Sequence, residues 1–388
     1  MKICEDIQNN IFSYIENKHK FKDRSIEKIF IDTYKAKILN KIPENKIRPL
    51  WVGFKITPIC NMKCEHCWAN LKGKEYSLDN IKKALDKLSE IQILHLTLSG
   101  GEPFIRNDWE EIFSYAKEKR MCLEIFTNGS LINEDICKKL NKILDKNVDT
   151  IQISLDGSNK EYYLMQRKKD CFEKVINSIK LLKKFGFTVR VNFTATNLNQ
   201  SEIFNTFKLC NILNVDTFSI SHVYDLNKGK SLYDKVNFKE YLEEINLCII
   251  NASEFITDLK LFIPVEFFSL TAAKVEKKEL KIKDKNIFLN WFINSNGDIY
   301  PDVTLELDDF FIGNIYYNSL NDIYLKLENL STKLLERNLS NVKCSNCSNA
   351  LICRGEILVE LTKNIKVLIW LILSVLLINN KKGKHYEY

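Results

Sequence analysis

The feature that most constrains this chain is a loop with three cysteines, CNMKCEHC, at positions 60–67. Twelve cysteines scattered at random over 388 residues would give this spacing roughly 0.01 times, so chance is a poor explanation. Three thiolates on one loop can hold three irons of a [4Fe-4S] cluster and leave the fourth iron open to a small molecule. A closed zinc site, with His66 as the nearby fourth ligand, and unrelated thiols are the alternatives. We therefore expect Cys60, Cys64 and Cys67 to be the catalytic metal ligands of an open iron-sulfur site.

Short apolar runs alternate with helical stretches after this loop, which indicates an α/β fold with a parallel sheet. The near-continuous apolar character of the runs favours a sheet that is covered on both faces. The six expected strands are 52–57, 93–98, 123–126, 150–155, 188–195 and 217–221. The expected helices are 78–88, 109–119, 133–144, 172–185 and 200–213.

Glycines mark the carboxyl ends of three of these strands. Gly100 and Gly101 follow the second strand, Gly129 the third and Gly157 the fourth. Parallel barrels keep their ligand loops at this end, where the backbone must approach a ligand closely. The loops with these glycines and the cysteine loop are therefore expected at one mouth of the sheet.

These motifs resemble those of the radical S-adenosylmethionine (SAM) enzymes. The cysteine loop matches their cluster motif, and SGGEP at 99–103, TNG at 127–129 and SLDG at 154–157 follow in family order. The resemblance covers residues from about 50 to 260. A weaker resemblance to the SPASM auxiliary-cluster domain covers about 285 to 356. Together the two resemblances imply a partial (β/α)6 TIM-like barrel with a small C-terminal SPASM-like domain.

The resemblance also implies the cofactors and the reaction. SAM would bind the open iron of the [4Fe-4S] cluster, and its reductive cleavage would give a 5′-deoxyadenosyl radical that abstracts hydrogen from a substrate. Arg167 matches a position that meets the SAM carboxylate, because arginine pairs with carboxylates through two hydrogen bonds, although Arg190 could serve instead. The cofactor-binding residues by this resemblance are Gly100, Gly101, Glu102, Asn128, Ser154 and Arg167.

The C-terminal part departs from the SPASM pattern. Asp302 stands where the family has a cysteine after the hairpin, and Ile357 stands where it has the fourth cysteine of the last motif. Cys344, Cys347 and Cys353 remain, and we treat them as candidate metal ligands. They could hold one auxiliary iron-sulfur cluster or a zinc ion, or be thiols left by a degraded domain.

The resulting expected domains are an N-terminal helical cap at 1–48, the radical SAM partial barrel at 49–265, a degenerate SPASM-like domain at 266–356 and a hydrophobic, then basic tail at 357–388. The 12 residues at 367–378, apolar except for Ser374, would span about 18 Å as a helix, too short for a hydrocarbon core of about 30 Å. Burial, or a truncated or frame-altered end, is favoured over a membrane anchor. The N-terminus lacks the apolar core of a signal peptide, so we expect a cytoplasmic protein.

The predicted function is a radical SAM oxidoreductase that modifies a peptide or small protein. Its partners would be that substrate and an electron donor such as flavodoxin or ferredoxin. Side-chain chemistry on a tetrapyrrole or other cofactor precursor is an alternative, as is a non-catalytic iron-sulfur or zinc protein. The net charge of +7 comes from interspersed lysines without a basic stripe, so nucleic acid is not an expected partner.

The missing cysteines lead to a prediction of iron content. Anaerobically reconstituted protein should carry about four to eight iron atoms per chain, because at most one auxiliary cluster has ligands. Iron and protein assays on the same sample measure this ratio. A ratio near twelve would show that a second auxiliary cluster is present.

Overall fold

A computed structural model of the chain describes residues 51–224, 226–261 and 290–335, together with position 49, residues 281–282 and residues 337–338. Several expected features lie outside these residues. They are the N-terminal cap at 1–48, the apolar tail, and the second cysteine group of Cys344, Cys347 and Cys353.

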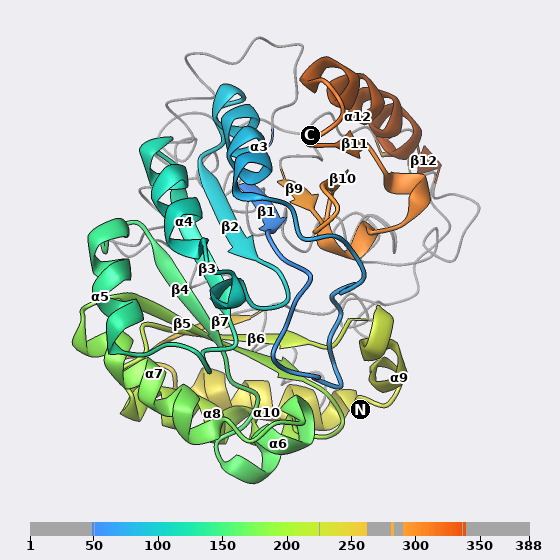
Figure 1. Cartoon of the computed structure of the whole chain (residues 1–388). Helices are drawn as coiled ribbons and strands as arrows, with labels where there is room; N and C mark the ends of the chain where they lie inside the picture. Colours follow the sequence, from blue (N-terminus) through green and yellow to red (C-terminus); the bar gives the residue numbers. More distant parts are fainter. Residues whose placement is uncertain are drawn as a thin grey trace, which may run out of the picture.

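Parallel strands in chain order form most of the main sheet (Figure 1). They are β1 (Trp51–Lys55), β2 (His95–Ser99), β3 (Cys122–Thr127), β4 (Thr150–Ser154), β5 (Thr188–Ala195), β6 (Thr217–His222) and β7 (Asp258–Leu261). Each pairs with the next in parallel register. Within the described residues the sheet does not close, since β7 ends one edge. The predicted partial barrel is therefore confirmed, with β7 as a strand that the sequence did not predict.

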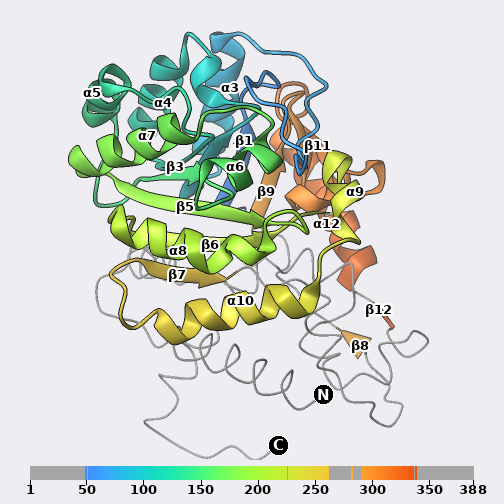
Figure 2. The ribbon, with the colours of Figure 1, turned by 90° about the horizontal axis from the view of Figure 1, so that it is seen from below.

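Helices connect the strands and cover the outer side of the sheet (Figure 1), while α8 and α10 lie beside β6 and β7 (Figure 2). They are α3 (Leu78–Glu90), α4 (Trp109–Glu118), α5 (Glu134–Ile143), α6 (Lys160–Arg167), α7 (Phe172–Lys184), α8 (Ile203–Ile212), α9 (Lys230–Tyr233) and α10 (Phe238–Asn251). Side-chain caps begin several of them: Asn133 Oδ1 accepts from Ile136 N at 2.9 Å, and Asn159 Oδ1 accepts from Glu161 N at 3.0 Å. Among the described residues, no helix combines the length and the apolar character that crossing a membrane requires.

A C-terminal hairpin extends the sheet at its other edge. β9 (Asn290–Ile293) pairs in parallel with β1, and β10 (Asp298–Tyr300) returns antiparallel to β9. The turn occurs at the predicted Asn296-Gly297, where Gly297 has φ +85°. β11 (Gly313–Asn314) and α12 (Leu320–Leu335) follow, and a separate short pair joins β8 (Lys281–Ile282) to β12 (Arg337–Asn338). The expected domain boundaries stay predictions.

The face of the strands opposite the apolar core carries a buried polar network. Trp51 Nε1 donates to Thr97 Oγ1 at 2.7 Å, and Thr97 Oγ1 donates to Glu124 Oε2 at 3.1 Å. Arg190 forms an ion pair with Glu124, and its Nε donates to Gln152 Oε1 at 2.9 Å. This face is more polar than the near-continuous apolar runs indicated. Because the network lies on the first halves of the strands, it stands away from their carboxyl ends.

Glu124 leads to a stability prediction. Burial opposes its ionisation, but Arg190 and His95 outweigh burial and lower the pKa of Glu124 to about 2. A folded-state pKa below the unfolded value stabilises the fold at pH above about 4.5, and this contribution is lost as the pH falls towards about 2. Glu124→Gln should therefore lower the free energy of unfolding by about 3–5 kcal/mol near neutral pH, because it leaves Arg190 as an unpaired buried cation.

The pH dependence makes this test specific. The difference between wild type and Glu124→Gln should shrink below about pH 4.5, as measured by urea unfolding at a series of pH values. Glu118→Gln, at an exposed position of α4, is the control and should follow the wild type. A difference that stays constant with pH would contradict the assigned ionisation of Glu124.

Candidate functional site

The three cysteines follow β1 at the carboxyl end of the sheet. Cys64 is buried, Cys60 and Cys67 are half-buried, and all three are free thiols. Burial raises the pKa of Cys60 to about 11, and the nearby Glu102, Cys64 and Cys67 add to this rise. Burial also raises the pKa of Cys64, against the effect of Arg167. Without metal these two thiols are therefore protonated at neutral pH, and metal binding must release their protons.

Backbone hydrogen bonds join the loop after β2 to the segment that leads from β1 into the cysteine loop. Gly101 N donates to Thr57 O at 2.8 Å, and Glu102 N donates to Ile59 O at 2.8 Å. A Cβ atom on Gly101 would lie 2.1 Å from Ile59 O, and one on Gly100 would lie 2.5 Å from Thr57 O. No side chain fits at either position without a backbone shift, so the Gly-Gly pair is required by this close approach.

Glu102 joins the loop after β2 to the loop after β3. Its carboxylate is fully buried and accepts hydrogen bonds from Thr127 Oγ1 at 2.7 Å and from Asn128 N at 2.8 Å. Phe104 N also donates to it at 3.3 Å. Burial raises the pKa of Glu102 to about 7, against the effect of these hydrogen bonds. Both carboxylate oxygens are engaged by the protein, so Glu102 positions two loops of the site whatever else it contacts.

Asn128 connects the loop after β3 to the cysteine loop. Asn128 Nδ2 donates to Asn61 Oδ1 at 2.8 Å, and Asn61 Nδ2 donates to Ser130 Oγ at 2.9 Å. Ser130 Oγ donates back to Asn128 Oδ1 at 2.6 Å, which closes a ring of three side chains. Asn61 directly follows Cys60, so this ring fixes the first half of the cysteine loop.

The loop after β4 and the end of α6 hold the second half of the cysteine loop in place. Arg167 Nη2 lies 2.5 Å from Asp156 Oδ2, and Arg167 Nη1 donates to Cys64 Sγ at 3.6 Å. His66 Nε2 lies 3.4 Å from the same Asp156 oxygen, and His66 Nδ1 lies 3.1 Å from Gln166 Oε1. Asp156 is completely buried, and its charge is balanced by Arg167.

The sequence left open whether Arg167 or Arg190 lies at the site, and the structure distinguishes them. Arg167 contacts the cysteine loop, whereas Arg190 is engaged in the Glu124 network. Among the described residues, Arg167 Nε is a buried donor without a hydrogen-bond partner. Ser154, the last residue of β4, lies at the same end of the sheet, and its hydroxyl makes no hydrogen bond to the described residues. These two groups are available to an added ligand.

Most of the predicted site residues thus come together around one loop. Gly101 and Glu102 bond to the backbone just before it, Asn128 bonds to Asn61, and Arg167 bonds to Cys64. Asn61 and Gln166 were not predicted. The position of Asn61 inside the cysteine motif was an available signal, whereas nothing in the sequence singles out Gln166.

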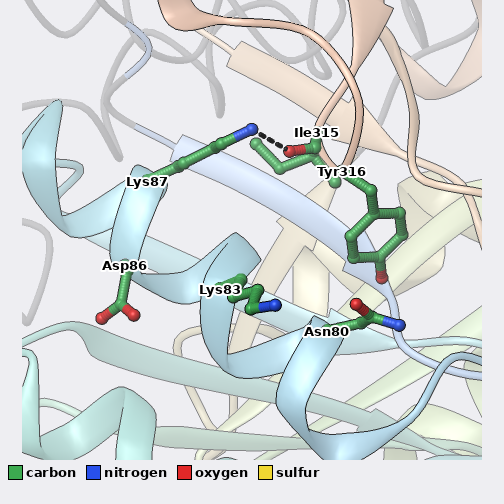
Figure 3. Close-up of a pocket in the computed structure, with 6 residues that line it drawn as sticks. All are labelled: Asn80, Lys83, Asp86, Lys87, Ile315 and Tyr316. Atoms are coloured by element: carbon green, nitrogen blue, oxygen red, sulfur yellow. Dashed lines mark hydrogen bonds between the residues drawn. The ribbon is translucent and has the colours of Figure 1, made fainter.

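A separate hollow of about 260 Å³ lies between α3 and the segment after β11 (Figure 3). Its lining residues are Asn80, Lys83, Asp86, Lys87, Ile315 and Tyr316. Lys87 Nζ donates to Ile315 O at 2.7 Å across one side of it. None of the cysteine-loop contacts belongs to this hollow, so we assign the chemistry to the loop.

The fold and the loop define an α/β partial barrel with three thiols and a converging set of ligand loops at its mouth. Residues 54–210 match the family model of the Radical SAM superfamily. This part of the chain belongs to the superfamily, its relatives include proteins of the SPASM type, and the protein is an enzyme.

Two curated relatives and one solved structure illustrate the relationship. The AdoMet-dependent heme synthase of Methanosarcina barkeri is 25% identical over 324 residues, which are 79% of this chain and 90% of that protein. The subtilosin biosynthesis protein AlbA of Bacillus subtilis is 27% identical over 290 residues, 71% of this chain and 59% of that protein. SuiB of Streptococcus suis bound to SAM has a TM-score of 0.64 at 18% identity, over 81% of this chain and 72% of that chain.

The family's cofactors are a [4Fe-4S] cluster and SAM, and the residues present fit both. Three free thiols on one loop suit three irons, and Arg167 Nε, which has no hydrogen-bond partner in the described part of the chain, suits an anionic group. Among the described residues, no three His, Cys, Asp or Glu side chains are grouped to hold a metal ion. In a [4Fe-4S] cluster the three thiolates would bind three different irons, so they need not converge on a single ion.

The Gly101 contact leads to a prediction. Gly101→Ala should displace the cysteine loop and lower iron binding by at least about tenfold, the scale seen when groups that orient metal ligands are removed. Iron per chain after anaerobic reconstitution is the measurement, with circular dichroism to verify the fold.

Gly53→Ala is the matched control. A Cβ atom on Gly53 would lie 3.5 Å from Phe292 Cδ2, an ordinary contact distance, so this variant should bind iron normally. Normal iron binding by Gly101→Ala would show that the backbone contact does not position the loop.

Proposed function

We propose that Cys60, Cys64 and Cys67 hold a [4Fe-4S] cluster at which the enzyme reductively cleaves SAM in order to modify a peptide or small protein. The observation that carries this proposal is the convergence of three independent loops on the cysteine loop. Bound together, the cluster and SAM supply a one-electron cleavage of the sulfonium and hence a hydrogen-abstracting radical.

The protein's own residues would bind and orient these groups. Arg167 is held by Asp156 beside Cys64, so its remaining Nε donor can bind the SAM carboxylate. Ser154, at the end of β4, has a hydroxyl that bonds to none of the described residues and could bind the same group. Gly100, Gly101 and Glu102 would meet the SAM amine through backbone carbonyls, because the Glu102 carboxylate already accepts three hydrogen bonds. Asn128 would line the same SAM-binding site.

The substrate proposal rests on the relatives. AlbA is a bacteriocin biosynthesis protein, which supports a peptide substrate. A tetrapyrrole is the second candidate, because the heme synthase of Methanosarcina barkeri is matched over 90% of its length. The electron would come from a donor such as flavodoxin or ferredoxin.

The cleavage proposal is tested with SAM and dithionite. Anaerobically reconstituted protein should release 5′-deoxyadenosine, and Cys64→Ala should reduce its rate of formation by at least about a hundredfold, because one iron loses its thiolate. Chromatography with mass detection measures the product. Cys122→Ala, at an isolated cysteine at the start of β3, should retain the wild-type rate. Unchanged turnover in Cys64→Ala would remove the loop from the mechanism.

The substrate candidates are separated by product analysis. A peptide encoded beside the gene and a panel of tetrapyrrole precursors are each incubated with enzyme, SAM and reductant, and the mass of each is followed. A SAM-dependent mass change in the peptide alone supports the first candidate. A mass change in a tetrapyrrole alone would show that the substrate is a tetrapyrrole and not a peptide.

A further inference from the structure

Lys55, the last residue of β1, is a buried cation beside the cysteine loop. Its side chain is 1% exposed, and Nζ lies 3.3 Å from Glu306 Oε2. The ring centroids of Trp68 and Phe292 lie 4.7 Å and 4.8 Å from the same nitrogen. A carboxylate and two aromatic faces are surroundings that stabilise an ammonium group.

The partners of Lys55 come from distant parts of the chain and are themselves held in place. Glu306 Oε1 accepts a hydrogen bond from Asn294 Nδ2 at 3.1 Å, and Trp68 O accepts one from Asn227 Nδ2 at 2.6 Å. Phe292 belongs to β9, which pairs with β1. The ion pair therefore has a fixed position between β1, the hairpin and the cysteine loop.

Trp68 connects Lys55 to the cysteine loop. Trp68 follows Cys67 in the chain, and its ring lies against Lys55 Nζ. Burial lowers the pKa of Lys55, and the adjacent Glu306 opposes this effect. Because Trp68 directly follows Cys67, its contact with Nζ places the Lys55 side chain beside the cysteine loop.

We propose that Lys55 and Glu306 are positioning residues that set the reduction potential of the cluster held by Cys60, Cys64 and Cys67. The proposal rests on the proposed function, since it needs the cluster at these thiols. Reduction adds one electron and makes the cluster more negative. A buried cation favours that step and a buried anion opposes it, and both effects are strong where water is excluded.

The two single variants have opposite expected effects. Lys55→Met removes the cation and should shift the midpoint potential to a more negative value. Glu306→Gln removes the anion and should shift it to a more positive value. Lys55→Met/Glu306→Met removes both charges and should return the potential close to that of the wild type. A purely structural role would not produce shifts of opposite sign.

The measurement is a redox titration of the reconstituted full chain, with dithionite as the electron source and electron paramagnetic resonance as the readout. Lys87→Met is the matched control. Lys87 also links the body to the C-terminal part, through Ile315 O at 2.7 Å and Asn318 O at 2.9 Å after β11, but it belongs to the hollow beside α3 (Figure 3). The midpoint potential of the cluster in Lys87→Met should equal that of the wild type.

Shifts of the same sign in Lys55→Met and Glu306→Gln, or none in either, would overturn the inference. Lys55→Met leaves the Glu306 carboxylate without its cation and could for that reason fail to bind a cluster. In that case the potentials of Glu306→Gln and of the double variant test the inference, because both lack this carboxylate. A wild-type chain that binds no cluster would instead overturn the proposed function. An intact cluster with unchanged potentials overturns only the role of the ion pair.

Discussion

The site depends on one close approach of two backbones. Gly101 lies so near Ile59 that a methyl group has no room, and two hydrogen bonds run between these loops. Hydrogen bonds between backbones fix both position and orientation, and they leave the cysteine side chains free to bind metal. The loop itself has little regular structure between residues 56 and 77, so its shape must come from its neighbours.

Those neighbours form a connected set of buried polar groups. Glu102 bonds to Thr127 and Asn128, Asn128 to Asn61, and Asp156 to Arg167, with the Arg167 guanidinium ending at Cys64. Each buried carboxylate therefore has donors, which is the condition for burying charge near a metal ligand. The geometry of the thiols is consequently coupled to the loops after β2, β3 and β4, and a change in any of them reaches the metal site.

The sequence predicts the local structure of this protein better than its long-range contacts. The strands β1 to β6 were evident because short apolar runs alternate with helical stretches, and the hairpin was evident from Asn296-Gly297. β7 is four residues long and contains Lys260, so its pattern was too short to recognise. Nothing local shows that β9 pairs with β1, that Arg167 rather than Arg190 reaches the cysteines, or that Lys55 meets Glu306, because each depends on how distant segments come together.

The pairing of β9 with β1 has a consequence for biosynthesis. Trp51 and Asn290 are neighbours in the sheet but about 240 residues apart in the chain. At ribosomal rates of about 5–20 residues per second, the cysteine loop emerges on the order of 10 to 50 seconds before β9 can cover the edge beside it. During that interval the nascent thiols lack one wall of their final environment. Metal delivery on the ribosome would therefore encounter a more open site than metal delivery to the finished chain.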